Sequence, residues 1–213
     1  MKRTLVAVTL SVTLLFQLPV IEASDWSRVA KMLYASTAPI SCSAHKQVTC
    51  SSFSINRNQG LYMTALHCLD PYSGEGTGDK SEIDVPTLDG KPLKVIYENK
   101  TLDLAIIQSD VRRLALQYRT ETLEVGNEVA ALGFGAGMTT PMLRTAVVSL
   151  FLTDSEGTEW ILLDNALIPG MSGGPIVDFR GRVVGVNDKS NQYSGMSLSI
   201  AQILAATRFW AVD

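Results

Sequence analysis

The stretch Gly170-Met-Ser-Gly-Gly-Pro175 says most about the fold and chemistry of this chain of 213 residues. Ser172 stands between glycines, and a serine hydroxyl becomes a useful nucleophile only beside an imidazole base and fixed N–H donors. Without a Cβ, Gly170 can adopt a positive φ and turn its amide, together with that of Ser172, toward one point. The stretch predicts a nucleophilic serine with an oxyanion hole formed by these two amides. The alternative interpretation is a plain glycine turn.

A base for Ser172 has to come from one of two histidines, His45 and His67. His67 ends the apolar, strand-like run that starts at Tyr62, so a strand terminus would hold its ring. His45 lies in a polar stretch, where a solvated surface histidine is expected. The sequence therefore favours His67 as the base.

The third group of such a site is a carboxylate that orients the imidazole and stabilises the imidazolium. Asp103 directly precedes the apolar run Leu104–Ile107, where an unpaired carboxylate would be costly to desolvate. We expect Asp103 to fill this role. An exposed aspartate at the start of a strand is the alternative.

The rest of the chain indicates an all-β protein. Short apolar or alternating runs bounded by turn signals predict strands. These runs are Leu93–Tyr97, Leu104–Ile107, Glu128–Leu132, Ala146–Leu152, Trp160–Leu163, Pro175–Val177 and Val183–Val186. Such strands without crossover helices favour antiparallel barrels or a sandwich. Helices are predicted at Trp26–Tyr34 and Ile200–Trp210, and the polar segment 109–124 is the expected connector between two halves.

The N-terminus has the pattern of a secretory signal peptide over residues 1–23, with cleavage after Ala23, and an uncleaved membrane anchor is the alternative. Removing 23 residues leaves 190, with 16 basic (18 minus Lys2 and Arg3) and 20 acidic (21 minus Glu22). The resulting charge near −4 makes nucleic acid an unexpected partner. No second apolar run of spanning length follows, so no membrane association is expected after cleavage.

Cys42, Cys50 and Cys68 permit at most one internal disulfide. A zinc site is the competing interpretation, but the spacing contains no close C-x-x-C pair. Gly133–Gly137 is glycine-rich, yet it lacks the strand–turn–helix setting of a dinucleotide site and is expected to be a loop. We therefore expect no metal and no cofactor.

Three motifs together resemble those of the trypsin-like serine proteases. Thr64-Ala-Leu-His-Cys68 is similar to the family's Thr-Ala-Ala-His-Cys, and Asp103-Leu-Ala-Ile106 is similar to its Asp-Leu/Ile-Ala-Leu/Val. Gly170–Pro175 is similar to its Gly-Asp/Asn-Ser-Gly-Gly-Pro, and the order His, Asp, Ser also matches. Residues 163–174, 123–133 and 145–149 resemble the HtrA-like branch, and the likeness extends over nearly all of residues 48–205.

The resemblance implies two antiparallel six-stranded β-barrels with the active site between them, a short N-terminal helix and a C-terminal helix. It predicts an N-terminal barrel over 24–118 carrying His67 and Asp103, and a C-terminal barrel with its helix over 119–213 carrying Ser172. It also implies a Cys50–Cys68 disulfide, with Cys42 unpaired. The implied substrate pocket consists of Ala166, Leu167, Ile168, Gly185, Val186 and Asn187.

The expected function is an exported serine endopeptidase, secreted or periplasmic, acting on polypeptides as a monomer. Met171 stands where the family usually has Asp or Asn, so activation by a new N-terminus pairing with an acid there is not expected. No PDZ domain is expected after residue 213. Uncharged Ala166 predicts a preference for small or aliphatic side chains before the cut. The alternatives are a catalytically inactive binding module and an esterase using the same triad.

Overall fold

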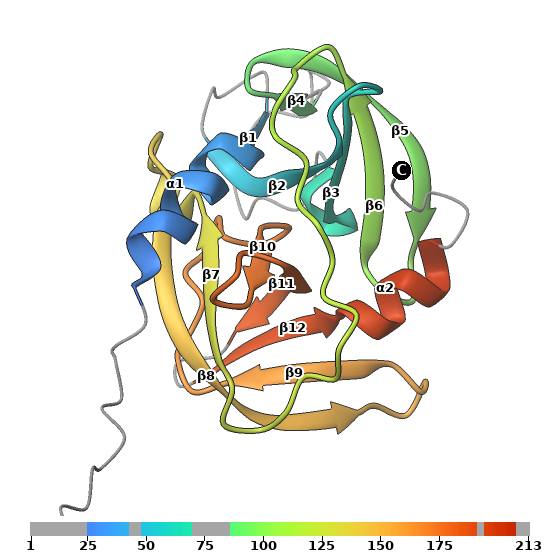
Figure 1. Cartoon of the computed structure of the whole chain (residues 1–213). Helices are drawn as coiled ribbons and strands as arrows, with labels where there is room; N and C mark the ends of the chain where they lie inside the picture. The colour runs from blue at the N-terminus through green and yellow to red at the C-terminus, as the bar shows by residue number, and fades with distance from the viewer. Residues whose placement is uncertain (1–24, 43–47, 70–85, 191–193, 208–213) are drawn as a thin grey trace, which may run out of the picture.

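Two closed antiparallel barrels of six strands each make up the body of the protein (Figure 1). The computed structural model describes residues 25–42, 48–69, 86–190 and 194–207. The predicted signal peptide, His45 and the predicted end of the C-terminal helix lie outside these residues. The predicted all-β fold with two six-stranded barrels and two helices is confirmed.

The first barrel has the strand order β1-β2-β3-β6-β5-β4. Its strands are β1 (Thr37–Cys42), β2 (Val48–Asn56), β3 (Leu61–Ala65), β4 (Pro86–Leu88), β5 (Lys91–Asn99) and β6 (Leu104–Ser109). Every residue of β3 is buried, because this strand lies between β2 and β6 and also faces the second barrel. The short 3-10 helix η1 (Leu66–Leu69) follows β3 directly and turns the chain out of the barrel wall.

The second barrel has the order β10-β11-β12-β9-β8-β7. Its strands are β7 (Glu128–Gly133), β8 (Met142–Thr153), β9 (Glu159–Leu163), β10 (Pro175–Val177), β11 (Val183–Ser190) and β12 (Gly195–Ser199). A short 3-10 turn, η2 (Gly135–Gly137), lies between β7 and β8. The nucleophile stretch falls in the loop from β9 to β10, in front of the shortest strand of this barrel.

A shared core holds the two barrels together. One buried cluster contains Phe53 and Leu104 from the first barrel and Leu132 and Val183 from the second. The segment between β6 and β7, which includes all of the predicted connector except Ser109, contacts both barrels. Leu116 N–H donates to Ser54 O at 3.0 Å, and Arg119 N–H donates to the carbonyl of Val183 at 2.9 Å. The barrels therefore form one unit with a fixed interface.

One helix precedes the first barrel in the chain, and a second follows the last strand of the second barrel. Helix α1 (Trp26–Ser36) begins after Asp25, whose side chain accepts the Ser27 N–H at 2.9 Å as an N-cap. Helix α2 (Ile200–Thr207) continues from β12 of the second barrel toward β5 of the first (Figure 1), where Tyr97 Oη donates to Ala206 O at 3.3 Å. Within the described residues no helix is both long and apolar enough to cross a membrane.

Candidate active site

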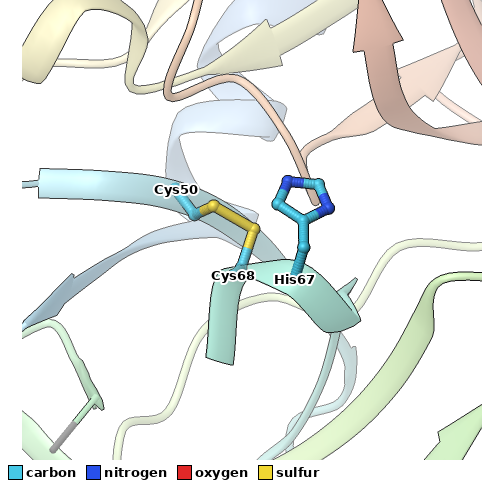
Figure 2. Close-up of side chains that lie close together, drawn as sticks. All are labelled: Cys50, His67 and Cys68. Carbon is cyan, nitrogen blue, oxygen red and sulfur yellow. A yellow bond between two sulfur atoms is a disulfide. The ribbon is translucent and has the colours of Figure 1, made fainter. Parts of the chain in front are cut away.

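His67 is held by the turn that follows β3. The disulfide between Cys50 and Cys68 joins β2 to this turn beside the histidine (Figure 2), with Cα atoms 5.7 Å apart. The His67 side chain keeps 39% of its surface exposed, while Cys68 is buried. The disulfide thus holds the backbone that carries His67 in place, while the imidazole ring remains accessible to solvent.

Both carboxylate oxygens of Asp103 interact with His67. The backbone N–H of His67 donates to Oδ1 at 2.9 Å, and the ring Nδ1 lies 2.5 Å from Oδ2. Asp103 itself has a φ of 49°, in the left-handed region that Asp tolerates better than most residues, and its carbonyl accepts Leu66 N–H at 2.9 Å. The backbone around Asp103 therefore aligns its side chain with the turn that carries His67.

The pairing changes the protonation of both groups. The hydrogen bond to Asp103 raises the pKa of His67, although burial opposes this. Burial alone would raise the pKa of Asp103, but the hydrogen bonds and charge of His67 outweigh it and keep that pKa below its usual value. Asp103 thus stays ionised, and Nδ1 of the neutral ring is its natural donor, which leaves Nε2 as an acceptor.

The loop before Ser172 turns the peptide that precedes Gly170. Met171 N–H donates to Ile168 O at 2.9 Å, which closes a turn with Pro169 and Gly170 at its centre and a φ of 97° at Gly170. Proline followed by a positive-φ glycine is the pattern of a type II turn. The carbonyl of Pro169 accepts Ala136 N–H of η2 at 2.7 Å. Since C=O and N–H of a trans peptide point in opposite directions, Gly170 N–H is turned away from η2.

Ser51 of the first barrel fixes this loop from the other side. Its backbone N–H donates to Ser172 O at 2.8 Å, and its hydroxyl donates to Gly170 O at 2.7 Å. The same hydroxyl accepts Phe134 N–H at 2.8 Å. Ser51 has no exposed surface, so these bonds are made in the interface between the barrels. One buried serine therefore connects β2, the nucleophile loop and the end of β7.

Ser172 lies beside the turn that carries His67. Its carbonyl oxygen is 3.6 Å from the Cys68 sulfur, and its hydroxyl donates to the backbone carbonyl of Asp188 at 3.1 Å. Asp188, near the end of β11, also approaches His67, with 3.8 Å between its Oδ1 and the ring Nδ1. The three residues predicted from the sequence are thus brought to one place, and a second aspartate joins them.

Met171 and Asn187 support the loop from within the second barrel. Met171 is fully buried in that barrel's core, so apolar packing holds the position where the family usually has Asp or Asn. Asn187 is also fully buried; its side chain donates to Met171 O at 3.3 Å, and its backbone bonds to Gly173 and Gly174 at 2.8 and 2.9 Å. A Cβ on Gly173 would lie 2.2 Å from Thr64 Oγ1, so only glycine fits there.

The other residues of the predicted pocket lie around this loop. Leu167 is 8% exposed and packs in the core of the second barrel, while Ala166 and Ile168 are half-buried. Gly185 is buried, and Val186 is part of the core shared by the barrels. Of these residues, the half-buried Ala166 and Ile168 have side-chain surface available to a substrate.

Sequence reasoning missed Asp188, Ser51 and Ala136. Asp188 directly follows Asn187, the last residue of the predicted pocket, and an acidic residue at the end of an apolar strand was an available signal. Ser51 lies beside a cysteine in a run of small polar residues and carries no comparable signal. Ala136 acts through its backbone, so its side chain could not have identified it.

Two groups of side chains have metal-ligand geometry among the described residues. One combines His67 with Cys50 and Cys68, but both sulfurs are in the disulfide and offer no thiolate. The other comprises His67, Asp103 and Asp188, each with one ligand atom within 4.8 Å of the others. The hydrogen bond between His67 and Asp103 already uses two of these groups.

Two β-barrels, with His67 and Asp103 from the first and Ser172 in a loop of the second, are the arrangement expected for a trypsin-like fold. Residues 50–186 match the family model of the trypsin-like peptidase domain, and the chain belongs to this family. The predicted resemblance to trypsin-like, HtrA-like proteases is confirmed.

Relatives of the HtrA type match with modest identity. The chain is 31% identical over 160 residues to a probable periplasmic serine endoprotease DegP-like from Halomonas elongata, covering 70% of this chain and 32% of the relative. It is 27% identical over 142 residues to the putative serine protease HhoA of Synechocystis, covering 61% and 34%. The chain thus spans about a third of the length of these relatives.

Solved structures match the fold at low identity. The active form of the Rv3671c protease from M. tuberculosis superposes with a TM-score of 0.68 at 19% identity, covering 87% of this chain and 85% of that chain. Deg5 superposes with a TM-score of 0.67 at 20% identity, covering 87% and 95%.

Proposed function

We propose that the protein is an exported serine endopeptidase that cleaves polypeptides through a covalent acyl-enzyme. The proposal rests on the hydrogen bond between the His67 ring and Asp103, formed beside Ser172. The loop that carries Ser172 directs the Gly170 amide away from η2. His67 is the base, Asp103 the group that orients it, and Ser172 the nucleophile. Family membership and DegP-like relatives support the reaction class.

Acylation follows from the hydrogen bonds of the site. Ser172 Oγ, which donates to Asp188 O, rotates about its Cα–Cβ bond toward Nε2 of His67. Nε2 takes the hydroxyl proton as Oγ bonds to the scissile carbonyl carbon, and the resulting imidazolium is stabilised by Asp103. The imidazolium then gives its proton to the leaving amine as the C–N bond breaks. Water attacks the acyl-enzyme with His67 again acting as base.

The amides of Gly170 and Ser172 would stabilise the oxyanion formed in each step. Two hydrogen bonds support this orientation: Ala136 N–H donates to Pro169 O, and Ser51 Oγ donates to Gly170 O. Because both hold carbonyls of the turn in place, the amide of Gly170 needs no reorganisation when charge develops. Apolar packing of Met171 takes the place of an ion pair in anchoring the loop.

Labelling with a fluorophosphonate probe tests the nucleophile, with Ser172→Ala as the control. We expect labelling of the wild-type protein alone, together with digestion of casein. A folded wild-type protein that resists the probe would overturn the proposal in favour of a binding module. Labelling without digestion of casein or peptides, but with hydrolysis of simple esters, would instead favour an esterase.

Ser51→Ala tests the support of the oxyanion hole. It removes a donor to Gly170 O and an acceptor for Phe134 N–H, so we expect kcat to fall about tenfold with KM nearly unchanged. Ser52→Ala is the matched control, because Ser52 is equally buried on the same strand and its hydroxyl bonds to Ala38 O, away from the loop. Equal losses in the two variants would contradict this role.

Substrate preference would follow from the uncharged residues near the nucleophile. Ala166 and Ile168 offer no charge to a lysine or arginine side chain, so we propose a preference for small or aliphatic residues before the cut. Profiling with a peptide library tests this, and strong cleavage after arginine or lysine would contradict it.

The proposed location is the periplasm or the cell exterior, reached through the predicted signal peptide. The periplasmic description of the DegP-like relatives supports it. Fractionation of cells producing the full chain, with N-terminal sequencing of the exported form, tests it. An intact N-terminus in the cytosolic fraction would contradict it.

A further inference from the structure

Asp188 is a buried carboxyl group that the chemistry described above does not use. Its side chain is 3% exposed and lies beside the three residues of the proposed triad, His67, Asp103 and Ser172. The mechanism uses only its backbone carbonyl, which accepts the Ser172 hydroxyl. A carboxylate buried to this degree requires either donors or a proton.

The carboxyl oxygens of Asp188 are buried. Among the described residues, neither Oδ1 nor Oδ2 accepts a hydrogen bond. In the described part of the chain, the charged groups that face Asp188 are Asp103, His67 with Nδ1 3.8 Å from Oδ1, and Lys189 with Nζ 3.6 Å from Oδ2. Lys189 is 60% exposed and lies over the Trp160 ring, so water screens its charge.

The carboxyl group of Asp103 is the natural acceptor for a proton on Asp188. The two side chains and the His67 ring each place an atom within 4.8 Å of the others. Two neighbouring carboxylates cannot both ionise cheaply, and a proton held by one becomes a donor to the other. Burial, followed by the contact with Asp103, raises the pKa of Asp188 to about 7, against the weaker opposing effects of Lys189 and His67.

We propose that Asp188 is a positioning residue that holds a proton and donates it as a hydrogen bond to the Asp103 carboxylate, making the site a coupled group of His67, Asp103 and Asp188. The proposal deepens the serine protease mechanism and rests on it. The proton stays on Asp188 during turnover, and no bond is made or broken there. Its effect is to hold the Asp103 carboxylate against the His67 ring.

This coupling predicts that two protons, one on the His67 ring and one on Asp188, titrate together, whereas in an ordinary triad only the histidine titrates. As the pH rises, the group loses one proton from the imidazolium and one from Asp188, and the two losses influence each other. An ionised Asp188 stabilises the imidazolium, since its charge raises the pKa of His67. The His67 ring should therefore titrate over a broad, two-step range that extends to higher pH.

The decisive experiment follows the His67 ring by NMR in the Ser172→Ala protein, with and without Asp188→Asn. Asparagine can still donate to Asp103 but cannot ionise. We expect the two-step titration to become a single step at lower pH. Because the nucleophile is absent in both proteins, the result does not depend on whether the protein hydrolyses peptides. An unchanged titration would overturn the proposal.

Asp110→Asn is the matched control for the loss of one negative charge. Asp110 is exposed and follows the last residue of β6, while Asp103 precedes the first, so the two are separated by roughly 20 Å of extended chain. We expect the His67 titration to stay as in the parent protein. A shift equal to that of Asp188→Asn would show a general charge effect and overturn the coupling.

Kinetics separate positioning from a general loss of structure. Asp188→Ala removes the donor and should lower kcat about tenfold with little change in KM. Asp188→Asn should restore most of this loss and move the acid limb of kcat/KM to lower pH. Equal activity of the two variants, with the wild-type pH profile, would refute the role of the proton. Absence of Ser172-dependent labelling in every variant would instead refute the protease function.

Discussion

Two buried aspartates lie ten residues apart on the same hairpin and have opposite surroundings. Asp178, 1% exposed, directly follows β10. Its Oδ1 accepts the N–H groups of Arg180 and Arg182 at 3.0 Å each, and its Oδ2 accepts the Arg182 guanidinium at 2.7 and 3.0 Å. Asp188 finds no such donors among the residues that the structure describes, and it faces a second carboxylate. Hydrogen bonds and the guanidinium compensate the negative charge of Asp178, which stabilises the fold. Asp188 lacks this compensation and instead holds a proton beside the proposed catalytic pair.

The same substitution at both positions should have unequal costs. Asp178→Asn removes a buried charge that an arginine surrounds, so we expect the free energy of unfolding to fall by about 3 kcal/mol. Asp188→Asn mimics the protonated acid and should cost under about 1 kcal/mol near neutral pH. Urea unfolding at pH 7 measures both, and equal losses would break the distinction between the two sites.

Arg182→Met should make Asp178 resemble Asp188. It leaves a buried carboxylate without its bidentate partner, while Arg119 stays 3.8 Å away, so we expect a loss of about 2 kcal/mol at pH 7. Urea unfolding at pH 7 provides the test, and a stability equal to that of the wild type would contradict it.

These contrasts mark the extent to which the sequence determines the site. Motif residues His67, Asp103 and Ser172 could be placed because their chemistry requires particular side chains at strand ends and between glycines. Strands could be predicted where apolar runs are uninterrupted, as in Leu104–Ile107. Strand β1 was not predicted, because Thr37–Cys42 contains polar residues and a proline.

Contacts between distant segments could not be predicted in the same way. Ser51 acts on Gly170 from 119 positions away, and Ala136 acts through its amide alone. Asp178 and Asp188 each lie near the end of an apolar run. The partner of Asp178 is Arg182, four positions away in the same hairpin, whereas Asp188 meets Asp103 of the other barrel, 85 positions away (188 minus 103). Only the fold reveals this second contact.

The pH dependence of stability should differ between wild type and Asp188→Asn. The pKa of Asp188 is raised from 3.8 to about 7 on folding, so its protonated form contributes stability that is complete below pH 3.8 and is lost as the pH rises through about 7. We expect wild type to lose about 2 kcal/mol relative to Asp188→Asn between pH 4 and pH 8, less than the full shift implies because Asp103 shares the proton. Parallel curves of unfolding free energy against pH would contradict this.

Lys189→Gln should have the smallest effect and tests what keeps Asp188 protonated. If the exposed ammonium 3.6 Å away governed the carboxyl group, its loss would change the site strongly; if burial and Asp103 govern it, the change should be slight. Because the charge of Lys189 favours ionisation, its removal should let Asp188 keep its proton to somewhat higher pH, with stability changed by under about 0.5 kcal/mol. The carboxylic-acid band of Asp188 in infrared difference spectra, identified by its absence in Asp188→Asn, follows this directly. A large shift of that band would mean that the pair with Lys189, rather than the contact with Asp103, sets the protonation of the group, and Asp188 would then be an ion-paired residue of the same kind as Asp178.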